Sequence, residues 1–328
     1  ETYLRGKNGE QKFYIDNVGR ISEIISSTDS VAGDDLYLSI DADLQKATYL
    51  ALQNEIAAIV YSNIKSGELP INDVYTALIG NSVINTEHFS KAKASDTEKN
   101  VLSVFKSRQK TTLGKIKQEL TSSPEALNTM SDEVLDEFTY IISMLKDDQV
   151  LLKNEIDTSD SVYQKWKNQK ISPKEYLSYC ITQHWIDISQ LNVDEKYADS
   201  TEVYDALCKY ILKNIKTDTE FSKIIYQYMI TRGEISPRQL CLILFDQGVL
   251  DYDDATVNKL KNGSLSPRDF LMKKIYNIEI TPAQLALEPC TGSCVVTDEK
   301  TGEILAMVSY PGYDSNKLAN GVDSEYFA

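Results

Sequence analysis

A serine followed by a lysine one helical turn later can act as a nucleophile, because the lysine amine can take the proton of the serine hydroxyl. This Ser-x-x-Lys spacing occurs at Ser62 and Lys65, at Ser103 and Lys106, and at Ser143 and Lys146. A chain of this composition is expected to contain about two or three such tetrads by chance. We therefore predict that these tetrads lie on solvated helix faces and are not catalytic.

The histidines of the chain are too few and too far apart in sequence to indicate a catalytic triad. The chain has two histidines, His88 and His184, which are far apart in the sequence. A Ser/His/Asp or Cys/His triad needs a histidine oriented beside the nucleophile, so neither histidine is predicted to be catalytic. With 49 acidic residues in the chain, a catalytic site in which paired carboxylates act as general acid and base stays possible. Their abundance also makes any single Asp or Glu uninformative.

The cysteines do not form a convincing metal motif. The chain has five of them, Cys180, Cys208, Cys241, Cys290 and Cys294. The Cys-x3-Cys pair at Cys290 and Cys294 has no histidine nearby, so it is poor support for zinc. Free thiols, or one short disulfide in an oxidising compartment, both fit this pair. No metal site and no cofactor site is predicted.

Composition excludes several classes of protein. The 328 residues carry a formal net charge of −15, and 42% of them are apolar. This apolar content argues against whole-chain disorder, and the acidic balance argues against a protein that binds nucleic acid through its phosphates. No apolar run is long enough to cross a bilayer, and the first residues lack the pattern of a signal peptide. Both ends of the chain look cut.

The first 65 residues predict two hairpin strands, one further strand and a long helix. Apolar runs surround a glycine-containing turn over residues 13–25, which is a hairpin pattern. Residues 36–40 predict another strand, and the carboxylate of Asp41 can cap the helix that follows. From Leu44 to about Lys65, apolar residues recur at helical spacing.

The next two hundred residues predict a succession of helices. An apolar residue, a hydroxyl residue and a proline stand together before four of them, at residues 171–173, 235–237, 265–267 and 280–282. The hydroxyl can accept a hydrogen bond from a free N–H of the first turn, and proline at the first position has no N–H to leave unpaired. Ser95 with Glu98 and Ser172 with Glu175 predict capping boxes. The four starts are spaced irregularly, which favours shared capping chemistry over a repeat array.

The last part of the chain predicts a second hairpin. Residues 293–297 and 303–309 are two apolar arms, and residues 298–302 between them contain a glycine that suits a turn. Both arms are nearly continuously apolar, so this hairpin is expected to be covered on both faces.

Two segments at opposite ends of the helical block resemble the opening of a penicillin-binding protein transpeptidase domain. The first is residues 35–47, DLYLSIDADLQKA, and the second is residues 292–316, GSCVVTDEKTGEILAMVSYPGYDSN. Upstream, YLRGKNG at residues 3–9 and VGR at residues 18–20 resemble the end of the pedestal that precedes this domain in class B, or monofunctional, members. The resemblance covers about the first 65 and the last 48 residues.

This resemblance implies an α+β chain that is a partial transpeptidase fold interrupted by a large all-α insertion. Residues 1–34 would be the end of the pedestal or dimerisation region, and residues 35–66 the first strand and first helix of the transpeptidase domain. Residues 67–280 would form the helical insertion, which loops tolerate because closure entropy grows slowly with length. Residues 281–328 would form the hairpin and the approach to the active site.

The family's catalytic motifs are a Ser-x-x-Lys tetrad, a Ser-x-Asn triplet and a Lys-Thr-Gly strand. Lys300-Thr301-Gly302 spells the third motif, but it falls between two apolar arms, where turn residues belong. No Ser-x-Asn triplet occurs in the chain. The resemblance therefore places the nucleophile beyond Ala328, and no residue of this chain is predicted to be catalytic.

The resemblance implies that the full protein is a membrane-anchored, extracytoplasmic D,D-transpeptidase that cross-links peptidoglycan stem peptides through an acyl-serine intermediate and is a β-lactam target. The chain alone is predicted to be inactive. An alternative is a non-enzymatic helical module that docks a cell-wall synthesis partner. The acidic surface and the lack of a chemical motif in the insertion support this alternative. A third hypothesis is a hydrolase built on paired acids in the insertion, which only the abundance of acidic residues supports.

Overall fold

The computed structural model describes residues 4–122, 125–191, 193, 199–313 and 317. The chain divides into two compact units, residues 1–52 with 293–328, and residues 53–292. We call them the terminal unit and the helical unit. The domain boundaries expected at residues 34, 66 and 280 stay predictions, and residues 314–316 and 318–328 of the expected approach to the active site lie outside the described residues.

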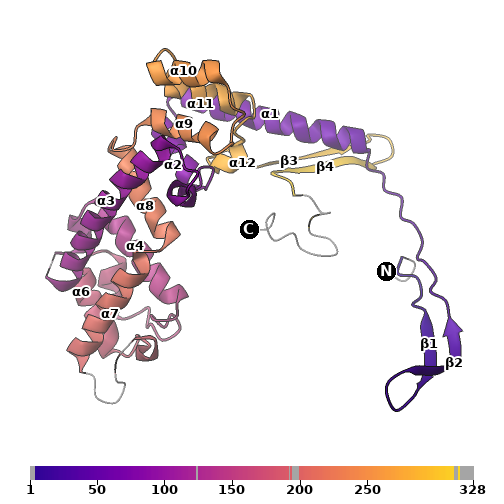
Figure 1. Cartoon of the computed structure of the whole chain (residues 1–328), viewed down its shortest axis with the longest axis horizontal. Coiled ribbons are helices and arrows are strands. Elements are labelled where there is room, and N and C mark those ends of the chain that lie inside the picture. The colour runs from indigo at the N-terminus through magenta and orange to yellow at the C-terminus, as the bar shows by residue number, and fades with distance from the viewer. Residues whose placement is uncertain (1–3, 123–124, 192, 194–198, 314–316, 318–328) are drawn as a thin grey trace. The chain divides into compact units, whose positions relative to one another are not determined.

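The terminal unit begins with the hairpin expected from the sequence. Strands β1 (Glu10–Ile15) and β2 (Ile21–Thr28) pair antiparallel (Figure 1). Asp16 holds the turn, because its Oδ1 accepts hydrogen bonds from the N–H groups of Val18 and Arg20, each at 2.9 Å. All residues of both strands are exposed, so the described chain covers neither face of this hairpin.

The strand expected at residues 36–40 is not present. Leu36, Tyr37 and Leu38 are 67%, 90% and 70% exposed, and no strand is assigned to this segment. A strand needs a ladder of backbone hydrogen bonds. Here the nearby contacts are one side-chain bond, from Ser39 Oγ, and one backbone bond, from the N–H of Asp41, to consecutive carbonyls of residues 304 and 305. That is too little to form a ladder.

Helix α1 (Ala42–Ser66) follows, as the apolar spacing predicted. Asp41 caps it, since its Oδ1 accepts from the N–H of Leu44 at 2.9 Å. Its buried residues, Ile56, Ala57, Val60 and Ile64, all lie in its second half. That half belongs to the helical unit, whereas residues 42–52 belong to the terminal unit.

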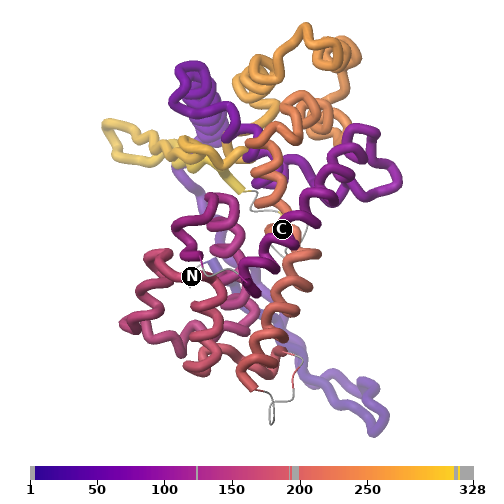
Figure 2. The backbone as a smooth tube through the Cα atoms, turned by 90° about the vertical axis from the view of Figure 1, so that its left-hand side faces the viewer, coloured from indigo at the N-terminus to yellow at the C-terminus, as the bar shows by residue number. Residues whose placement is uncertain are grey.

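The rest of the helical unit is a series of α-helices and short 3-10 turns (Figures 1 and 2). Its elements are α2 (Ile71–Gly80), η1 (Thr86–Ser90), α3 (Asp96–Thr121), η2 (Leu127–Thr129), α4 (Asp132–Asp147), α5 (Ser161–Lys167), α6 (Pro173–Thr182), η3 (Ile188–Gln190), α7 (Ser200–Ile215), α8 (Thr219–Thr231), α9 (Pro237–Asp246), α10 (Asp254–Asn262), α11 (Pro267–Tyr276) and α12 (Pro282–Leu285). Helix α8 contacts α2, α3 and α4 and buries Phe221, Ile225 and Met229 completely. The expected helical block is therefore present.

The four predicted helix starts are confirmed. Ser172, Ser236, Ser266 and Thr281 cap α6, α9, α11 and α12, each with proline in the first turn. The capping box expected at Ser95 is complete. At Ser172 only one of its two expected bonds is described, from the Glu175 N–H to the serine hydroxyl, so that prediction is confirmed in part.

The turns before these helices share a backbone conformation that the sequence pattern did not reveal. Three residues before each capping residue, the backbone has a positive φ: at Gln169, Gly233, Gly263 and Ile278. This left-handed residue ends the preceding helix. The apolar residue just before the cap then turns inward, and Ile171, Ile235 and Ile280 are buried. One turn geometry, rather than a regular repeat, explains the recurring motif.

The second expected hairpin is also present. Strands β3 (Gly292–Thr297) and β4 (Ile304–Tyr310) form a two-stranded sheet. Along β4, Ala306, Val308 and Tyr310 are buried, whereas Met307 is 59% exposed. On β3, Val295 is 57% exposed. Among the described residues, alternate positions of β4 are thus buried and exposed, so the expectation of cover on both faces is not met. Tyr49 of α1 packs against Tyr310, one of the buried residues.

Candidate functional site

The start of α1 is joined to β4, although 262 residues separate the bonded side chain from its partner. The Nε2 of Gln45 donates to the carbonyl oxygen of Met307 at 2.7 Å, and its Oε1 accepts from the Met307 N–H at 2.8 Å. The rings of Tyr49 and Tyr310 lie 5.7 Å apart. A glutamine side chain here satisfies both backbone groups of one strand residue, as a neighbouring strand would. The two segments that resemble the family therefore form one structural piece.

The Lys300-Thr301-Gly302 triplet lies in the turn between β3 and β4, as predicted. Asp298 Oδ1 accepts from the N–H groups of Thr301 and Lys300, at 2.8 and 2.7 Å. These hydrogen bonds lower the pKa of Asp298. Gly302 has a φ of +74°, which suits glycine. The triplet serves as an Asx-type turn and not as a strand along a cleft.

The Ser-x-x-Lys serines are exposed, as predicted. Ser62, Ser103 and Ser143 lie on α1, α3 and α4. Among the described hydrogen bonds, none joins a tetrad serine to its lysine, which a serine nucleophile activated by that amine requires. The sequence contains two further tetrads with this spacing, Ser90–Lys93 and Ser107–Lys110, and these residues are exposed as well.

The Ser143 tetrad differs from the other two because it borders a cavity. Ser143 and Lys146 line a space of about 330 Å³ together with Leu127, Tyr163 and Trp166. A cavity with an apolar and aromatic wall that also holds a serine and a lysine could in principle house a serine nucleophile. Position alone does not activate the hydroxyl, however, and no described base or orienting group is hydrogen-bonded to Ser143.

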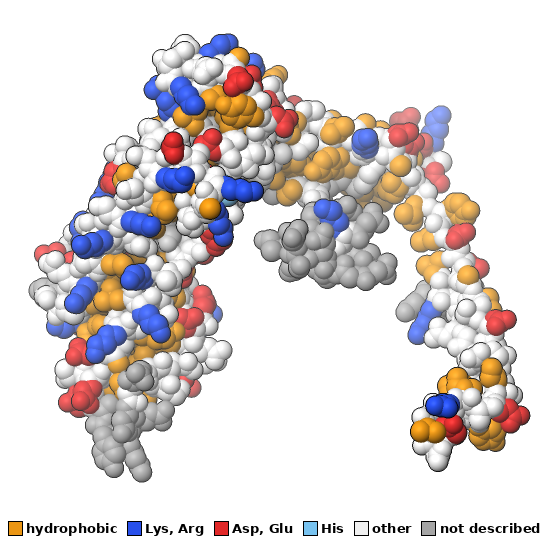
Figure 3. All heavy atoms as spheres, in the orientation of Figure 1, with side chains coloured by type: hydrophobic (Ala, Val, Ile, Leu, Met, Phe, Trp, Pro, Cys, Tyr) orange, Lys and Arg blue, Asp and Glu red, His pale blue; other side chains and the backbone are white. Residues whose placement is uncertain are grey.

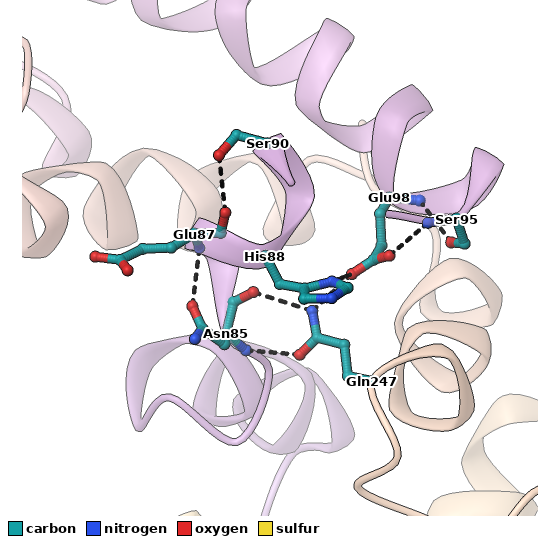
Figure 4. Close-up of polar contacts among 7 residues, drawn as sticks. All are labelled: Asn85, Glu87, His88, Ser90, Ser95, Glu98 and Gln247. Carbon is teal, nitrogen blue, oxygen red and sulfur yellow. Dashed lines mark hydrogen bonds and ion pairs between the residues drawn. The ribbon is translucent and has the colours of Figure 1, made fainter. Parts of the chain in front are cut away.

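His88 belongs to a polar network around Glu98 (Figure 4). Its Nδ1 lies 2.7 Å from Glu98 Oε1, and the Nε2 of Gln247 donates to the same oxygen at 2.8 Å. The other carboxylate oxygen accepts from the N–H of Ser95 at 2.7 Å. Gln247 also exchanges two hydrogen bonds with the backbone of Asn85. The network thus joins η1, the start of α3 and the end of α9.

The electrostatics of this network are those of a structural site. Glu98 is completely buried. Burial alone would raise the pKa of Glu98, but the hydrogen bonds from Gln247, Ser95 and His88 outweigh it and hold that pKa below its usual value. The hydroxyl of Ser90, the serine nearest His88 in sequence, donates to the carbonyl of Glu87 at 2.9 Å instead. The geometry therefore positions His88 to fix a carboxylate, not to activate a nucleophile.

His184 serves a different purpose and is not brought into this network. It has a φ of +59° and follows α6, three residues before Asp187, which caps η3. It is therefore another left-handed turn residue of the kind described above. The five cysteines are free thiols; Cys180, Cys208 and Cys241 are buried, and burial raises the pKa of Cys208 to about 11.

A buried ionic cluster joins α3, α4 and the end of α8. Arg108 Nη2 donates to both carboxylate oxygens of Glu133, at 2.7 and 2.9 Å, and Arg232 contacts the same carboxylate at 2.6 Å. Glu133 is 4% exposed. This cluster was not predicted from the sequence. The signal was the i, i+4 spacing of Glu133 and Glu137 among the apolar residues of one helix.

Glu137 is the most perturbed carboxyl of that cluster. It is 2% exposed. Burial, and then the neighbouring Glu133 charge, raise the pKa of Glu137 to about 8. No hydrogen bond to its carboxyl is found in the described part of the chain. A raised pKa can indicate a functional acid, but Glu137 lies one helical turn from Glu133 and its ion pairs with Arg108 and Arg232, so we interpret it as a determinant of stability.

The described residues hold no group of three His, Cys, Asp or Glu side chains that could bind a metal ion. Among them, no helix is both long enough and apolar enough to cross a bilayer.

Two curated proteins resemble the chain in sequence. Both are the peptidoglycan D,D-transpeptidase FtsI, one from Escherichia coli strain K12 and one from Escherichia coli O157:H7, and each is 34% identical over 102 residues. The chain is related to the penicillin-binding proteins. The match covers 31% of the chain and 17% of each relative, so the chain spans a small part of their length. No protein-family model and no solved structure matches it.

Proposed function

We propose that the chain is part of a class B penicillin-binding protein that cross-links peptidoglycan by D,D-transpeptidation. The observation that carries this proposal is the Gln45–Met307 contact, which unites the two segments that resemble the family across 262 residues. The sequence match to FtsI also supports it. In this role α1 and the β3–β4 hairpin are scaffold, and the β1–β2 hairpin is the end of the pedestal region.

The reaction proceeds in two transfers in this proposal. A serine Oγ attacks the stem-peptide carbonyl, the terminal D-amino acid leaves with the proton, and a serine ester forms. The amine of a second stem peptide then attacks the ester, which forms the cross-link and returns the proton to the serine. A β-lactam is opened by the same serine and stays attached to it.

The nucleophilic serine of this proposal is not among residues 1–328. Ser62, Ser103 and Ser143 lie on helices that precede the hairpin, and no described hydrogen bond activates them. The Lys300-Thr301-Gly302 triplet is in a turn. The catalytic tetrad, the Ser-x-Asn triplet and the active-site Lys-Thr-Gly would follow Ala328 in the complete protein.

The helical residues 67–280 are an insertion into the transpeptidase fold in this proposal. The complete protein acts at the outer face of the cell membrane, on peptidoglycan stem peptides. Docking of a cell-wall synthesis partner by the insertion stays a prediction.

Acylation by a fluorescent penicillin, followed by peptide mapping, tests the proposed function. The complete natural protein is expected to carry one label, on a serine that follows residue 328. The chain of residues 1–328 is expected to keep its unmodified intact mass under the same conditions. No label on the complete protein, or a label on Ser62, Ser103 or Ser143, would contradict the proposal.

A further inference from the structure

The helical unit has a surface cavity between α1 and α11 that no step of the proposed function uses. Its volume is about 510 Å³. It is lined by Tyr61, Asp269, Met272, Lys273, Tyr276 and Asn277. The guanidinium of Arg268 donates to the carbonyl of Ile64 at 3.0 Å, which ties α11 to the end of α1 next to this cavity. The walls are therefore fixed relative to each other.

Helix α11 presents a mixed polar and aromatic stripe to the cavity. Asp269, Lys273, Tyr276 and Asn277 follow one another at spacings of four, three and one, which places them on one helix face. In Figure 3, apolar side chains lie between basic and acidic ones on the surface over α10 and α11. This stripe therefore combines charged, polar and aromatic side chains on one surface.

Tyr276 supplies an aromatic surface that is open to a ligand. It is 56% exposed, and its ring centroid lies 5.2 Å from that of Tyr61 at an interplanar angle of 59°. Tyr61 packs against the core, so it holds the Tyr276 ring in place. A tyrosine ring supported in this way offers a flat apolar face at low entropic cost.

The polar groups beside the ring have unused hydrogen-bonding capacity. Lys273 makes no ion pair with another described residue, whereas the next residue, Lys274, pairs with Glu279. Asp269 Oδ2 accepts from Ser266 Oγ at 3.0 Å, which leaves its other oxygen for a ligand. Asn277 Nδ2 donates to Glu279 Oε1 at 3.4 Å, which leaves its amide oxygen and its second amide proton for a ligand.

We propose that this cavity binds the glycan strand of peptidoglycan. The inference rests on the proposed function for the choice of glycan. A pyranose ring has an apolar C–H face that stacks on tyrosine and an edge of hydroxyl and acetamido groups that Asp269, Lys273 and Asn277 can bond. One acid and one base line the cavity: Asp269 can accept from sugar hydroxyls, and Lys273 can pair with the lactyl carboxylate that the strand carries once its stem peptides are removed. Met272 also lines the cavity but is only 5% exposed, so it offers little apolar surface to a peptide side chain.

Calorimetric titration of the chain with soluble glycan strands, freed of stem peptides by an amidase, tests this proposal. The wild-type chain is expected to bind. Tyr276→Ala is expected to weaken binding about tenfold, and Tyr276→Phe to change it less than about twofold, since the ring is kept. Asp269→Asn is expected to weaken binding about threefold.

Tyr252→Ala is the matched control. Tyr252 is a comparably exposed tyrosine, at 61%, and its ring contacts another aromatic ring, that of Phe245, but it does not line the cavity. Its loss is expected to leave glycan binding unchanged. Thermal unfolding of each variant, followed by circular dichroism, checks that all of them are folded.

Three results would overturn the proposal: no binding to the wild type, equal loss in Tyr276→Ala and Tyr252→Ala, or binding of free stem peptides in place of the glycan. The outcome is separable from that of the proposed function. Glycan binding by a protein that penicillin never acylates would support the glycan site and contradict the proposed transpeptidase function. Acylation of the complete protein without glycan binding by this chain would remove the site alone.

Discussion

The helical unit and the terminal unit bury very different amounts of apolar surface. Nearly all buried apolar residues of the described chain belong to the helical unit, whereas those of the terminal unit are Ala306, Val308 and Tyr310. Large apolar residues of the terminal unit stay exposed, including Val18 at 74% and Tyr37 at 90%. Two-stranded hairpins are marginally stable in water. The helical unit therefore has a core sufficient for folding, and the terminal unit does not.

The largest expected effect comes from a substitution in the core of the helical unit. Phe221 on α8 is completely buried, and Phe221→Ala is expected to lower the free energy of unfolding by about 3–5 kcal/mol, because it removes buried apolar surface and leaves a cavity. Urea unfolding followed by circular dichroism at 222 nm measures it. The counterpart in the terminal unit is Phe13→Ala on exposed β1, with an expected change below about 0.5 kcal/mol. Equal losses would remove the contrast between the units.

The second effect is a pH dependence from the helical unit. The pKa of Glu137 is about 8 in the folded protein, above its unfolded value of 4.5, so the folded state holds the extra proton between these values. Its contribution to stability is complete below pH 4.5 and is lost as the pH rises to about 8. Because each pKa unit corresponds to about 1.4 kcal/mol, the loss is on the order of a few kcal/mol.

Glu137→Gln isolates this contribution. The variant cannot ionise at this position, so its stability relative to the wild type is expected to rise from pH 5 to pH 8 and then level off. Unfolding free energies from urea titrations at several pH values give the difference. A constant difference between pH 5 and pH 9 would show that Glu137 is ionised in the folded protein.

The third effect belongs to the terminal unit. Gln45→Ala removes both hydrogen bonds to the backbone of Met307 and is expected to cost about 2 kcal/mol of local stability. Hydrogen exchange at β4 is expected to accelerate, while exchange in α8 stays unchanged. Lys46→Ala, at the exposed neighbouring position, is the control. Acceleration spread over the helical unit would mean that the two units are energetically coupled.

The smallest effect tests the shared turn geometry. Ser236 accepts a hydrogen bond from the N–H of Gln239 at 3.3 Å and caps α9. Ser236→Ala is expected to lower stability by about 1 kcal/mol. Ser62→Ala, at an exposed tetrad serine, is expected to change it by less than about 0.5 kcal/mol. Comparable effects in the two variants, measured by thermal unfolding, would contradict the capping role.

Local chemistry explains which parts of the fold could be predicted. The start of α9 was predictable because Ser236 and Pro237 act within one turn of each other. The segment around Tyr37 was not, because a strand depends on a partner that the local sequence does not name. Apolar alternation alone did not distinguish a paired strand from an exposed extended segment.

The candidate sites divide in the same way. The Lys300-Thr301-Gly302 turn was predictable from the glycine and from the apolar arms on either side. The contact of Gln247 with Glu98 and the cavity beside Tyr276 were not, because each joins elements that are distant in sequence. The burial of Glu137 left one local signal, its i, i+4 spacing with Glu133. Such sites arise from tertiary packing, which a single sequence without a structure does not specify.

Expression of residues 42–290 alone, which keeps α1 whole, shows whether the helical unit folds on its own core. This segment is expected to unfold in a cooperative urea transition with a midpoint equal, within error, to that of the helical signal in residues 1–328. Loss of helical structure in the isolated segment, or a markedly lower midpoint, would contradict it. That result would mean that the terminal unit helps to hold the helices together.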